Sequence, residues 1–483
     1  MNKDILDKYE PIIGLEVHAQ LSTKSKIFAG DSTAFGNEPN TQISVITLGH
    51  PGTLPRLNEK VVELAVKMGL ACHCDITHEN IFDRKNYFYP DLPKGYQITQ
   101  DKTPICRNGY VTVKTKHGVH DITLTKIHLE EDAGKSIHVE GEDDTWVDFN
   151  RAGVPLIEIV TDPMIHSSEE ASGFLTEVRR LVRYLEICDG NMEEGSMRCD
   201  ANVSVRLKGD NELGKKVEVK NMNSIRNVQR AIDHEIGRQI KLLEANKEIV
   251  SETRTFNVIS GTTSGMRTKE ELNDYRYFPE PDLSPFIISD EWLNKVKSSL
   301  PSLPNELFDK FVKEFGLPEY DANVLIDNRE IASYFETLCD CTKKYKAASN
   351  WMMGPVKSYL NEATLSIANF PLTPQKLGEL IDLVEDGKVS FSVASQNIFH
   401  ELVKEPNSSA YELAKGLNLL QDSDQSSIQP LIDETLKAFP EKVAAYKKGK
   451  KGLLGMFMSE VMKRGEGKID PRLANELLRK SLG

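Results

Sequence analysis

Features that would place the chain in a membrane or a secretory pathway are missing from its sequence. No apolar run in the 483 residues approaches the ~18 residues that a membrane-spanning helix requires. The first residues, Met1 to Asp7, include two acids and no apolar stretch, so they predict neither a secretory nor a transit signal. We therefore expect a cytoplasmic protein that does not bind membranes.

Cysteine is scarce, with seven residues spread over the whole chain. An odd number at wide spacing is typical of reduced thiols rather than of a disulfide framework. Two pairs, Cys72/Cys74 and Cys339/Cys341, have Cys-x-Cys spacing, whereas zinc sites typically use Cys-x-x-Cys. We interpret both pairs as ordinary buried or surface thiols.

Familiar catalytic loops are absent as well. Gly134-Lys135-Ser136 is not a phosphate-binding loop, because the Walker pattern requires glycine where Leu129 stands. The chain has no Gly-x-Ser-x-Gly nucleophile elbow, and the turn at 261–265 lacks the glycine-flanked double serine of amidases. If the protein carries out amide chemistry, we therefore expect its ammonia to come from another protein.

The charge of the chain is unevenly distributed. The net charge of -13 argues against a general nucleic-acid-binding protein. Residues 440–483, however, contain eleven Lys and Arg against five Asp and Glu, a local net charge of +6. Four lysines, at 447, 448, 450 and 451, stand close together in this tail. The pattern predicts a basic tail that meets a polyanion.

The order of predicted elements indicates an α+β protein. The hydrophobic share of 39% and the charged share of 28% are typical of a globular chain. Strands are mixed with a few helices before the prolines at 279, 281 and 285, and nearly everything after them reads as helix. Pro406-Asn407-Ser408-Ser409 suggests a second boundary. The predicted domains are residues 1–285, 286–406 and 407–483.

Alternating patterns predict strands, and apolar stripes with caps predict helices. Strands are expected at 14–18, 110–115, 122–127, 198–206 and 217–221, with hairpins joining the second to the third and the fourth to the fifth. Helices are expected at 169–185, 227–246, from Pro374 to a stop at Gly387, and from Pro471 onward.

The strand at 198–206 is unusual because charged residues fill its open face. Successive strand residues point to opposite faces, so one face would carry Arg198, Asp200, Asn202, Ser204 and Arg206. The next strand, at 217–221, likewise places two charged residues, Glu218 and Lys220, on one face. Carboxylates and cations at this spacing suit a surface that handles phosphate and a metal ion.

Two further segments supply candidate ligands. Glu16 and His18 project from one strand face, although a solvated strand face is the simpler interpretation of that segment alone. Glu130 and Glu131 follow a strand pattern, and their adjacency requires a bulge or strand end if both are to reach one site. A solvated acidic turn is the alternative there.

Taken together, the acids predict a site for one or two Mg²⁺ ions with a nucleotide. The predicted metal ligands are Glu16, His18, Glu130, Glu131, Asp200 and Glu218. Arg198, Lys220 and Arg151 would neutralise charge on a transferred phosphoryl group. The aromatic residues between Phe82 and Tyr96, beside Arg84 and Lys85, could stack on bases or pack under a loop.

At these segments the sequence resembles the B subunit of the tRNA-dependent amidotransferases, the family that amidates Glu-tRNA(Gln) and Asp-tRNA(Asn). The resemblance runs end to end, and several long motifs in the right order are more specific than any one of them. The motifs are Ile13–His18, Asp83–Asp91, His128–Lys135, Asp148–Gly153, Met197–Ser204, Val217–Asn221 and Asp274–Pro279.

The resemblance implies a catalytic domain with a mainly antiparallel sheet, shaped as a cradle and related in fold to glutamine synthetase, then an all-α domain and a small all-α tail. It implies a heterotrimer with an amidase subunit, which releases ammonia from glutamine, and a third, small subunit. The B subunit would use ATP and Mg²⁺ to phosphorylate the side-chain carboxylate of the tRNA-bound amino acid, and ammonia would displace the phosphate.

The chain departs from some members of this family at one place. They carry a four-cysteine zinc site, and the matching positions here are Ala29, Asp31, Ser44 and Thr47. We therefore predict no zinc and a loop held by other packing. Two other functions are also considered. A freestanding ATP-dependent ligase for a small carboxylate would need no basic tail, and a non-catalytic RNA-binding scaffold would not need Glu16, His18 or Asp200.

Overall fold

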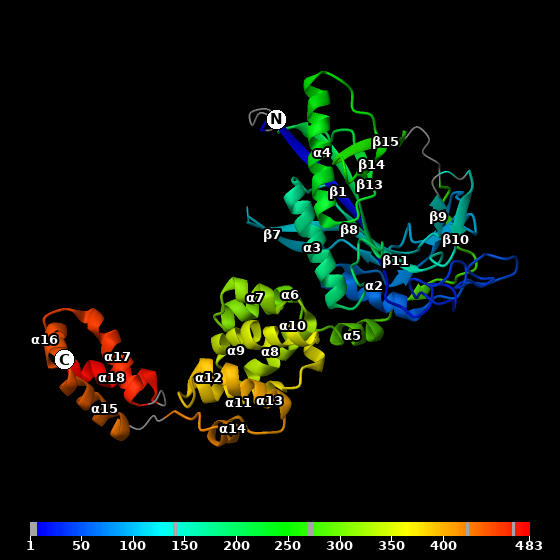
Figure 1. Cartoon of the computed structure of the whole chain (residues 1–483). Helices are drawn as coiled ribbons and strands as arrows, with labels where there is room; N and C mark the ends of the chain where they lie inside the picture. The colour runs from blue at the N-terminus through cyan, green and yellow to red at the C-terminus, as the bar shows by residue number, and fades with distance from the viewer. Residues whose placement is uncertain are drawn as a thin grey trace. The chain divides into compact units, whose positions relative to one another are not determined.

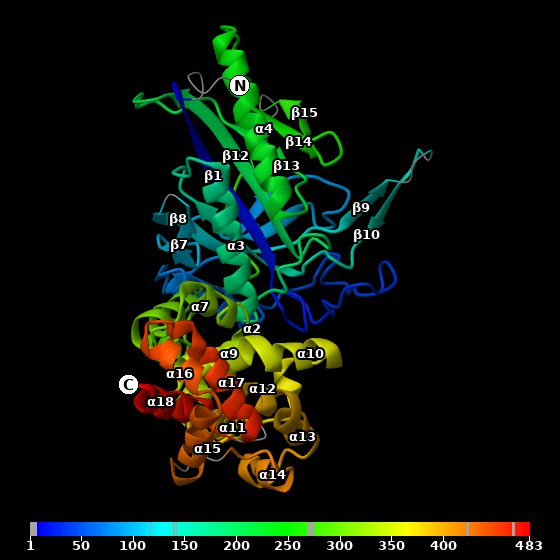
Figure 2. The same cartoon turned by 60° about the vertical axis from the view of Figure 1, so that its left-hand side comes forward.

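A computed structural model describes residues 7–116, 118–138, 141, 143–268, 275–421, 425–465 and 469–483. The chain folds as two compact units, residues 1–301 and 302–483. The first unit combines a large sheet with helices, and the second is built from helices (Figures 1 and 2). This order confirms the predicted α+β layout. In the part of the chain that is described, no helix is long and apolar enough to cross a membrane.

One ten-stranded sheet organises the first unit. All its neighbouring strands run antiparallel except β13 and β14, which are parallel. In spatial order the strands are β15 (Thr262–Thr268), β14 (Glu252–Asn257), β13 (Val217–Lys220), β12 (Met197–Leu207), β1 (Tyr9–Gln20), β11 (Pro155–Thr161), β8 (Gly118–Glu131), β6 (Cys106–Arg107) and β2 (Asp75–Ile76), and β7 (Tyr110–Thr115) also pairs with β8.

The predicted strands are present, and several are longer than expected. The segment at 14–18 belongs to the twelve-residue β1, and the hairpins β7–β8 and β12–β13 form as predicted. His117, in the first hairpin's connection, lies outside the described residues. Strand β1 lies between β11 and β12, so its residues have neighbours on both sides. Glu16 is opposite Asp200 on β12, and His18 is opposite Arg198 on β12 and Glu158 on β11.

Two helices cover one face of this sheet. α3 (Ser168–Tyr184) and α4 (Ile225–Glu244) lie side by side across it, as Figures 1 and 2 show. Ser167 caps α3 by accepting from the Glu170 amide, and Ser224 caps α4 in the same way. The strand side chains beneath them are apolar; Leu15 and Val17 are fully buried. Alternation therefore turns Glu16 and His18 to the opposite face, called the polar face below.

Small sheets surround the large one, and they extend the first unit beyond the predicted boundary at 285. The unit ends after Pro301 because segments near 285 pair with earlier strands. These elements are β3 (Glu79–Asn80) with β17 (Phe286–Ile287), β4 (Asp83–Asn86) with β5 (Tyr96–Thr99) and β16 (Phe278–Pro279), β9 (Lys135–His138) with β10 (Thr145–Asp148), and α5 (Asp290–Ser298), which packs on α2 (Glu59–Ala71).

Helices joined by short connections make up the described part of the second unit, and its last helices share a core of their own. Thr373 caps α11, whose first residue is Pro374, as predicted. Leu477 and Leu478 of the last helix pack with Phe457. The helices are α6 (Pro304–Asp309), α7 (Glu319–Leu325), α8 (Arg329–Thr342), α9 (Tyr345–Trp351), α10 (Lys357–Ala363), α11 (Pro374–Glu385), α12 (Phe391–Val393), α13 (Phe399–Lys404), α14 (Ala410–Gly416), α15 (Gln425–Ala438), α16 (Pro440–Lys447), α17 (Leu454–Arg464) and α18 (Pro471–Leu482). The predicted division of this unit at residue 406 stays a prediction.

Candidate active site

The polar face carries two groups of ligand-type side chains on five neighbouring strands. Glu16, Asp200 and Glu218 form the first group, which we call the acidic cluster. His18, Glu130 and Glu158 form the second, which we call the histidine cluster. Within each cluster, one ligand atom per residue lies within 4.8 Å of the others. Five of the six predicted metal ligands thus come together.

Lysine and asparagine side chains hold the acidic cluster. Lys220 Nζ donates to Asp200 Oδ2 and lies 3.1 Å from Glu218 Oε1. Asn202 Nδ2 donates to Glu16 Oε1 at 2.8 Å. The Glu16 pKa is raised, first by burial and then by the negative charges of Glu158, Glu218 and Asp200, although the hydrogen bond from Asn202 opposes the shift. Carboxylates that repel one another in this way favour a bound cation.

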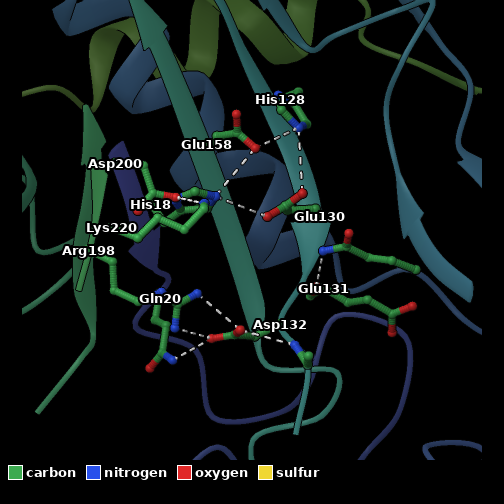
Figure 3. A network of polar contacts seen from close by, with 12 residues as sticks. His18, Gln20, His128, Glu130, Glu131, Asp132, Glu158, Arg198, Asp200 and Lys220 are labelled. Atoms are coloured by element: carbon green, nitrogen blue, oxygen red, sulfur yellow. Dashed lines mark hydrogen bonds and ion pairs between the residues drawn. The ribbon is translucent and has the colours of Figure 1, made fainter. Parts of the chain in front are cut away.

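A second imidazole, that of His128, lies beside the histidine cluster (Figure 3). His18 Nε2 lies 3.4 Å from Glu158 Oε2 and 3.7 Å from Glu130 Oε1. His128 Nε2 lies 3.5 Å from Glu158 Oε2 and 3.6 Å from Glu130 Oε2. Burial opposes protonation of His18, but its hydrogen bond to Glu158 and the charges of Glu158 and Glu130 raise its pKa to about 9. The charge of His18 therefore balances part of the charge of the two carboxylates.

A buried aspartate organises the arginines at the edge of the clusters. Arg198 donates from both terminal nitrogens to Asp132, each at 3.0 Å, and Gln20 Nε2 donates to Asp132 at 2.7 Å (Figure 3). Burial raises the pKa of Asp132, yet the charges of Arg198 and Arg151 bring it below its ordinary value. Arg151 itself donates to the carbonyls of Ala133 and Gly134 at 2.9 and 2.6 Å. Asp132 thus fixes Arg198, whereas Arg151 mainly holds the turn.

Glu131, the sixth predicted ligand, lies away from both clusters. Adjacent strand residues face opposite sides, and in Figure 3 its carboxylate points away from His18. Glu131 Oε1 accepts from Lys94 Nζ at 2.5 Å and from the Ile98 amide at 2.8 Å. Glu131 and Lys94 line a separate cavity of about 180 Å³ together with Lys26. The straight end of β8 therefore does not bring Glu130 and Glu131 to one site.

Glu158, His128 and Asp132 were not predicted as site residues, although each is central to the geometry. A single acid inside the apolar run 155–161 was the available signal for Glu158. Its pKa lies well below the ordinary value: burial raises it, but the His128 charge and the His18 hydrogen bond outweigh burial. The sequence alone does not show that β11 lies beside β1, and without that neighbour Glu158 reads as a solitary acid.

A cavity adjoins the acidic cluster. It has a volume of about 350 Å³, and its lining includes Gly14, Glu16, Asn202, Ser204 and Leu213. Cavities of this size are typical of small-molecule sites. Gly14 leaves the floor open because it has no side chain at a polar-face position. The cavity can therefore hold a small ligand beside Glu16 of the acidic cluster.

Comparisons with known proteins identify the family. Residues 11–294 match the family of the GatB/GatE catalytic domain, and residues 333–482 match that of the GatB domain. The chain belongs to the GatB family. It is 49% identical to the B subunit of the aspartyl/glutamyl-tRNA(Asn/Gln) amidotransferase of Chlorobium limicola, over 98% of this chain and 99% of that protein. The proteins of the same name from Caldanaerobacter subterraneus and Thermoanaerobacter sp. are each 48% identical, with the same coverage.

The GatB family match spans the whole candidate site. The strands that contribute to the two clusters lie within residues 11–294, except for the first two residues of β1. The motifs that predicted the resemblance supply all three residues of the acidic cluster and two of the histidine cluster. Asp274, in the last motif, lies outside the described residues.

Hydrogen bonds join three of the four positions at which the zinc site was considered, Asp31, Ser44 and Thr47. Asp31 Oδ2 accepts from the Ser44 amide at 3.0 Å, from the Ser44 hydroxyl at 2.9 Å and from the Thr47 hydroxyl. The carboxylate thus joins two parts of the loop, as the prediction of other packing requires. The absence of zinc itself stays a prediction.

Removing this carboxylate is expected to loosen the loop. Asp31→Ala leaves the buried Thr47 hydroxyl and the Ser44 amide without their acceptor, which costs about 2–3 kcal/mol for hydrogen bonds to a charged group. Amide hydrogen exchange in residues 36–54 should therefore become faster by roughly 30-fold or more. Asp31→Asn keeps one acceptor oxygen and should show a smaller change. Unchanged exchange in the alanine variant would contradict this role.

Proposed function

We propose that the polar face binds ATP with Mg²⁺ and activates the side-chain carboxylate of an aspartate or glutamate esterified to tRNA. The chain belongs to the GatB family along its whole length, and its relatives are named as amidotransferases of Asp-tRNA(Asn) and Glu-tRNA(Gln). A freestanding ligase and an RNA-binding scaffold are not favoured. The similarity to the relatives includes the helical tail, which a freestanding ligase would not need. A non-catalytic scaffold would not need the two clusters.

Activation is needed because a carboxylate is a poor electrophile. In the proposed first step, a carboxylate oxygen attacks the γ-phosphorus of ATP, the bond to the β-phosphate oxygen breaks, and ADP leaves. In the second step, ammonia attacks the acyl carbon, phosphate leaves and the nitrogen loses one proton, which gives the amide. A phosphoryl group leaves far more readily than hydroxide, so ATP cleavage drives the formation of the carbon–nitrogen bond.

The donor sets of the two clusters fit Mg²⁺. This ion prefers oxygen ligands and binds through a few carboxylates together with substrate phosphates. Glu16, Asp200 and Glu218 supply only carboxylate oxygens, and the histidine cluster adds two carboxylates and an imidazole. When bound, Mg²⁺ would neutralise charge that develops on the phosphates. The acidic cluster would bind Mg²⁺ more tightly than the histidine cluster, because all of its ligand atoms are oxygens.

Two cations of the chain would act on the phosphates directly. Lys220 lies between Asp200 and Glu218, so its ammonium is held at the acidic cluster. Arg198 is fixed by Asp132 and retains N–H groups that can donate to a phosphoryl oxygen. Preorganised donors of this kind stabilise the transition state without reorganisation during the reaction. Arg151 would instead keep the turn that carries Asp132 in place.

The wider assembly is part of the same proposal. The sheet and its polar face would form the cradle of a glutamine-synthetase-like fold in the cytoplasm. An amidase subunit would supply ammonia, because this chain lacks a hydrolase nucleophile motif, and a third, small subunit would complete a heterotrimer. The proposal rests on the observation that both clusters lie on the polar face of the large sheet.

The test is reconstitution of the complete reaction. The chain would be co-purified with the amidase and small subunits, and the complex would be given ATP, glutamine and each misacylated tRNA. Conversion of Glu-tRNA(Gln) or Asp-tRNA(Asn) that requires ATP supports the proposal. Conversion without ATP, or ATP-dependent amidation of free glutamate or aspartate without tRNA, contradicts it.

The basic tail, residues 407–483, is proposed to bind the body of the tRNA rather than its acceptor end. Lys447, Lys448 and Lys450 are exposed, and Lys451 Nζ lies 4.3 Å from the centre of the Tyr446 ring. Phosphate contacts release counterions, so each lost contact should flatten the dependence of log affinity on log salt by up to about 0.9. Replacing these four lysines with glutamine should therefore raise KM for tRNA several-fold and leave kcat nearly unchanged.

A matched variant controls for the loss of surface charge. Lys295→Gln with Lys297→Gln removes exposed lysines from α5 and should leave both the affinity and the salt slope unchanged. Filter binding at several salt concentrations measures the slope, and steady-state kinetics measures KM. Equal tRNA affinity and equal slope in the four-lysine variant and the wild type would contradict the role of the tail.

A further inference from the structure

An exposed group of aromatic side chains lies next to the histidine cluster and has no role in the chemistry described above. Phe88 is 86% exposed, Tyr89 48% and Tyr277 40%. Large apolar side chains gathered on a surface usually mark a binding site. We call the group the aromatic surface, and it comprises Tyr87, Phe88, Tyr89, Tyr275 and Tyr277 together with Lys85.

Ring contacts and backbone hydrogen bonds hold the aromatic surface in place. The Tyr87 ring centre lies 6.1 Å from that of Tyr89 and 6.0 Å from that of Tyr275. Tyr275 continues the series to Tyr277 at 6.2 Å. The Asn86 amide donates to the Tyr275 carbonyl at 2.9 Å, and this bond ties the two segments together. The four tyrosine rings therefore support one another before any ligand binds.

Lys85 lies over the rings of this surface, and Tyr87 connects the surface to the reaction site. Lys85 Nζ lies 4.9 Å from the centre of the Tyr275 ring and 5.7 Å from that of Tyr87. The Tyr87 hydroxyl donates to Gln97 Oε1 at 3.5 Å, and Gln97 Nε2 donates to the Glu131 carbonyl at 2.7 Å, so the surface is joined to the end of β8 that carries Glu130. The aromatic surface thus borders the histidine cluster.

We propose that the aromatic surface stacks the base of the 3′-terminal adenosine of the aminoacyl-tRNA, with Lys85 near the adjacent phosphate. This inference rests on the proposed function, because the reacting carboxylate is esterified to the ribose of that nucleotide. Roughly eight covalent bonds separate the carboxyl carbon from the base, so the two lie within about 10 Å of each other. When the reacting carboxylate lies at the clusters, the base of the terminal adenosine must therefore lie within about 10 Å of them.

The exposure of the rings favours the tRNA end over the base of ATP. A small ligand is normally enclosed in a cavity, and the cavity beside Glu16 offers about 350 Å³ for one. Phe88 is almost fully exposed and lines no enclosed volume among the described cavities. Open aromatic platforms with nearby cations are typical of single-stranded nucleic-acid ends.

Binding of uncharged tRNA tests the proposal without the chemistry. The complete complex would be titrated with a tRNA and with the same tRNA lacking its terminal adenosine. A stacked base is worth between about 5- and 100-fold in affinity. The wild type should bind the complete tRNA tighter by a factor in this range, and Phe88→Ala with Tyr89→Ala should bind both tRNAs equally. Phe88→Tyr with Tyr89→Phe keeps both rings and should keep the preference.

Phe35→Ala is the matched control, because Phe35 is 77% exposed and lies outside the aromatic surface. It should retain the preference for the complete tRNA. A wild-type complex without preference, or a double alanine variant that keeps it, overturns the proposal, as does a double variant that raises KM for ATP and not for tRNA. No ATP is present in the titration, so failure of the activation chemistry would leave its result unchanged.

Discussion

Asp200→Asn is expected to reduce tRNA-dependent ATP hydrolysis by at least about 100-fold while the heterotrimer still assembles. Asparagine keeps the volume of the side chain and removes one of the three carboxylates of the acidic cluster. Loss of a ligand or of a preorganised charge at such a site typically costs between about 10²- and 10³-fold. The fold should survive, because Lys220 keeps its contact with Glu218 at 3.1 Å.

Single-turnover ATP hydrolysis with misacylated tRNA measures this effect, and the glutaminase activity of the amidase subunit reports on the integrity of the complex. Glu10→Gln is the matched control. Glu10 lies on the same strand and face as Glu16, but it pairs with Arg206 at 2.9 Å and belongs to neither cluster. It should amidate nearly as fast as the wild type. Full amidation by Asp200→Asn would remove the acidic cluster from the reaction.

The sequence predicted individual elements well because their signals are local. The alternation at 198–206 requires only that one face be buried, and β12 extends over Met197–Leu207. The α3 helix follows from its apolar stripe and from Ser167, whose hydroxyl caps it. The order of the strands is not local. Glu16 faces Asp200 across a sheet in which β1 lies between strands that follow much later in the chain.

Only part of the site was predicted, because some of its residues follow from local signals and others depend on the order of the strands. Same-face spacing on one strand places Glu16 and His18 on one face of the sheet, although each belongs to a different cluster. Glu158 needed knowledge that β11 neighbours β1. Glu131 was grouped with Glu130 from sequence proximity, but alternation sends it to Lys94. The predicted boundary at 285 followed the prolines, whereas pairing of β17 with β3 keeps that segment in the first unit.

Arg198→Ala is expected to lower kcat by about 10²- to 10³-fold with little change in KM for tRNA. A donor that acts on charge developing in the transition state affects turnover rather than ground-state binding. The substitution also leaves Asp132 buried without its bidentate partner, which should cost about 3–5 kcal/mol of stability. A purely structural arginine would predict the second effect without a specific loss of kcat at temperatures where the variant is folded.

Two further variants separate these roles. Asp132→Asn keeps Arg198 and weakens only its orientation, so kcat should fall by about 10- to 100-fold, as for a residue that positions a reacting group. Arg198→Lys keeps the charge but loses the bidentate geometry, and its kcat should lie between those of the wild type and Arg198→Ala. Thermal unfolding of each complex gives the fraction folded, to which kcat is normalised. If normalised kcat were unchanged in Arg198→Ala, the arginine would serve only to hold Asp132, and Lys220 would remain as the one cation proposed to act on the phosphates.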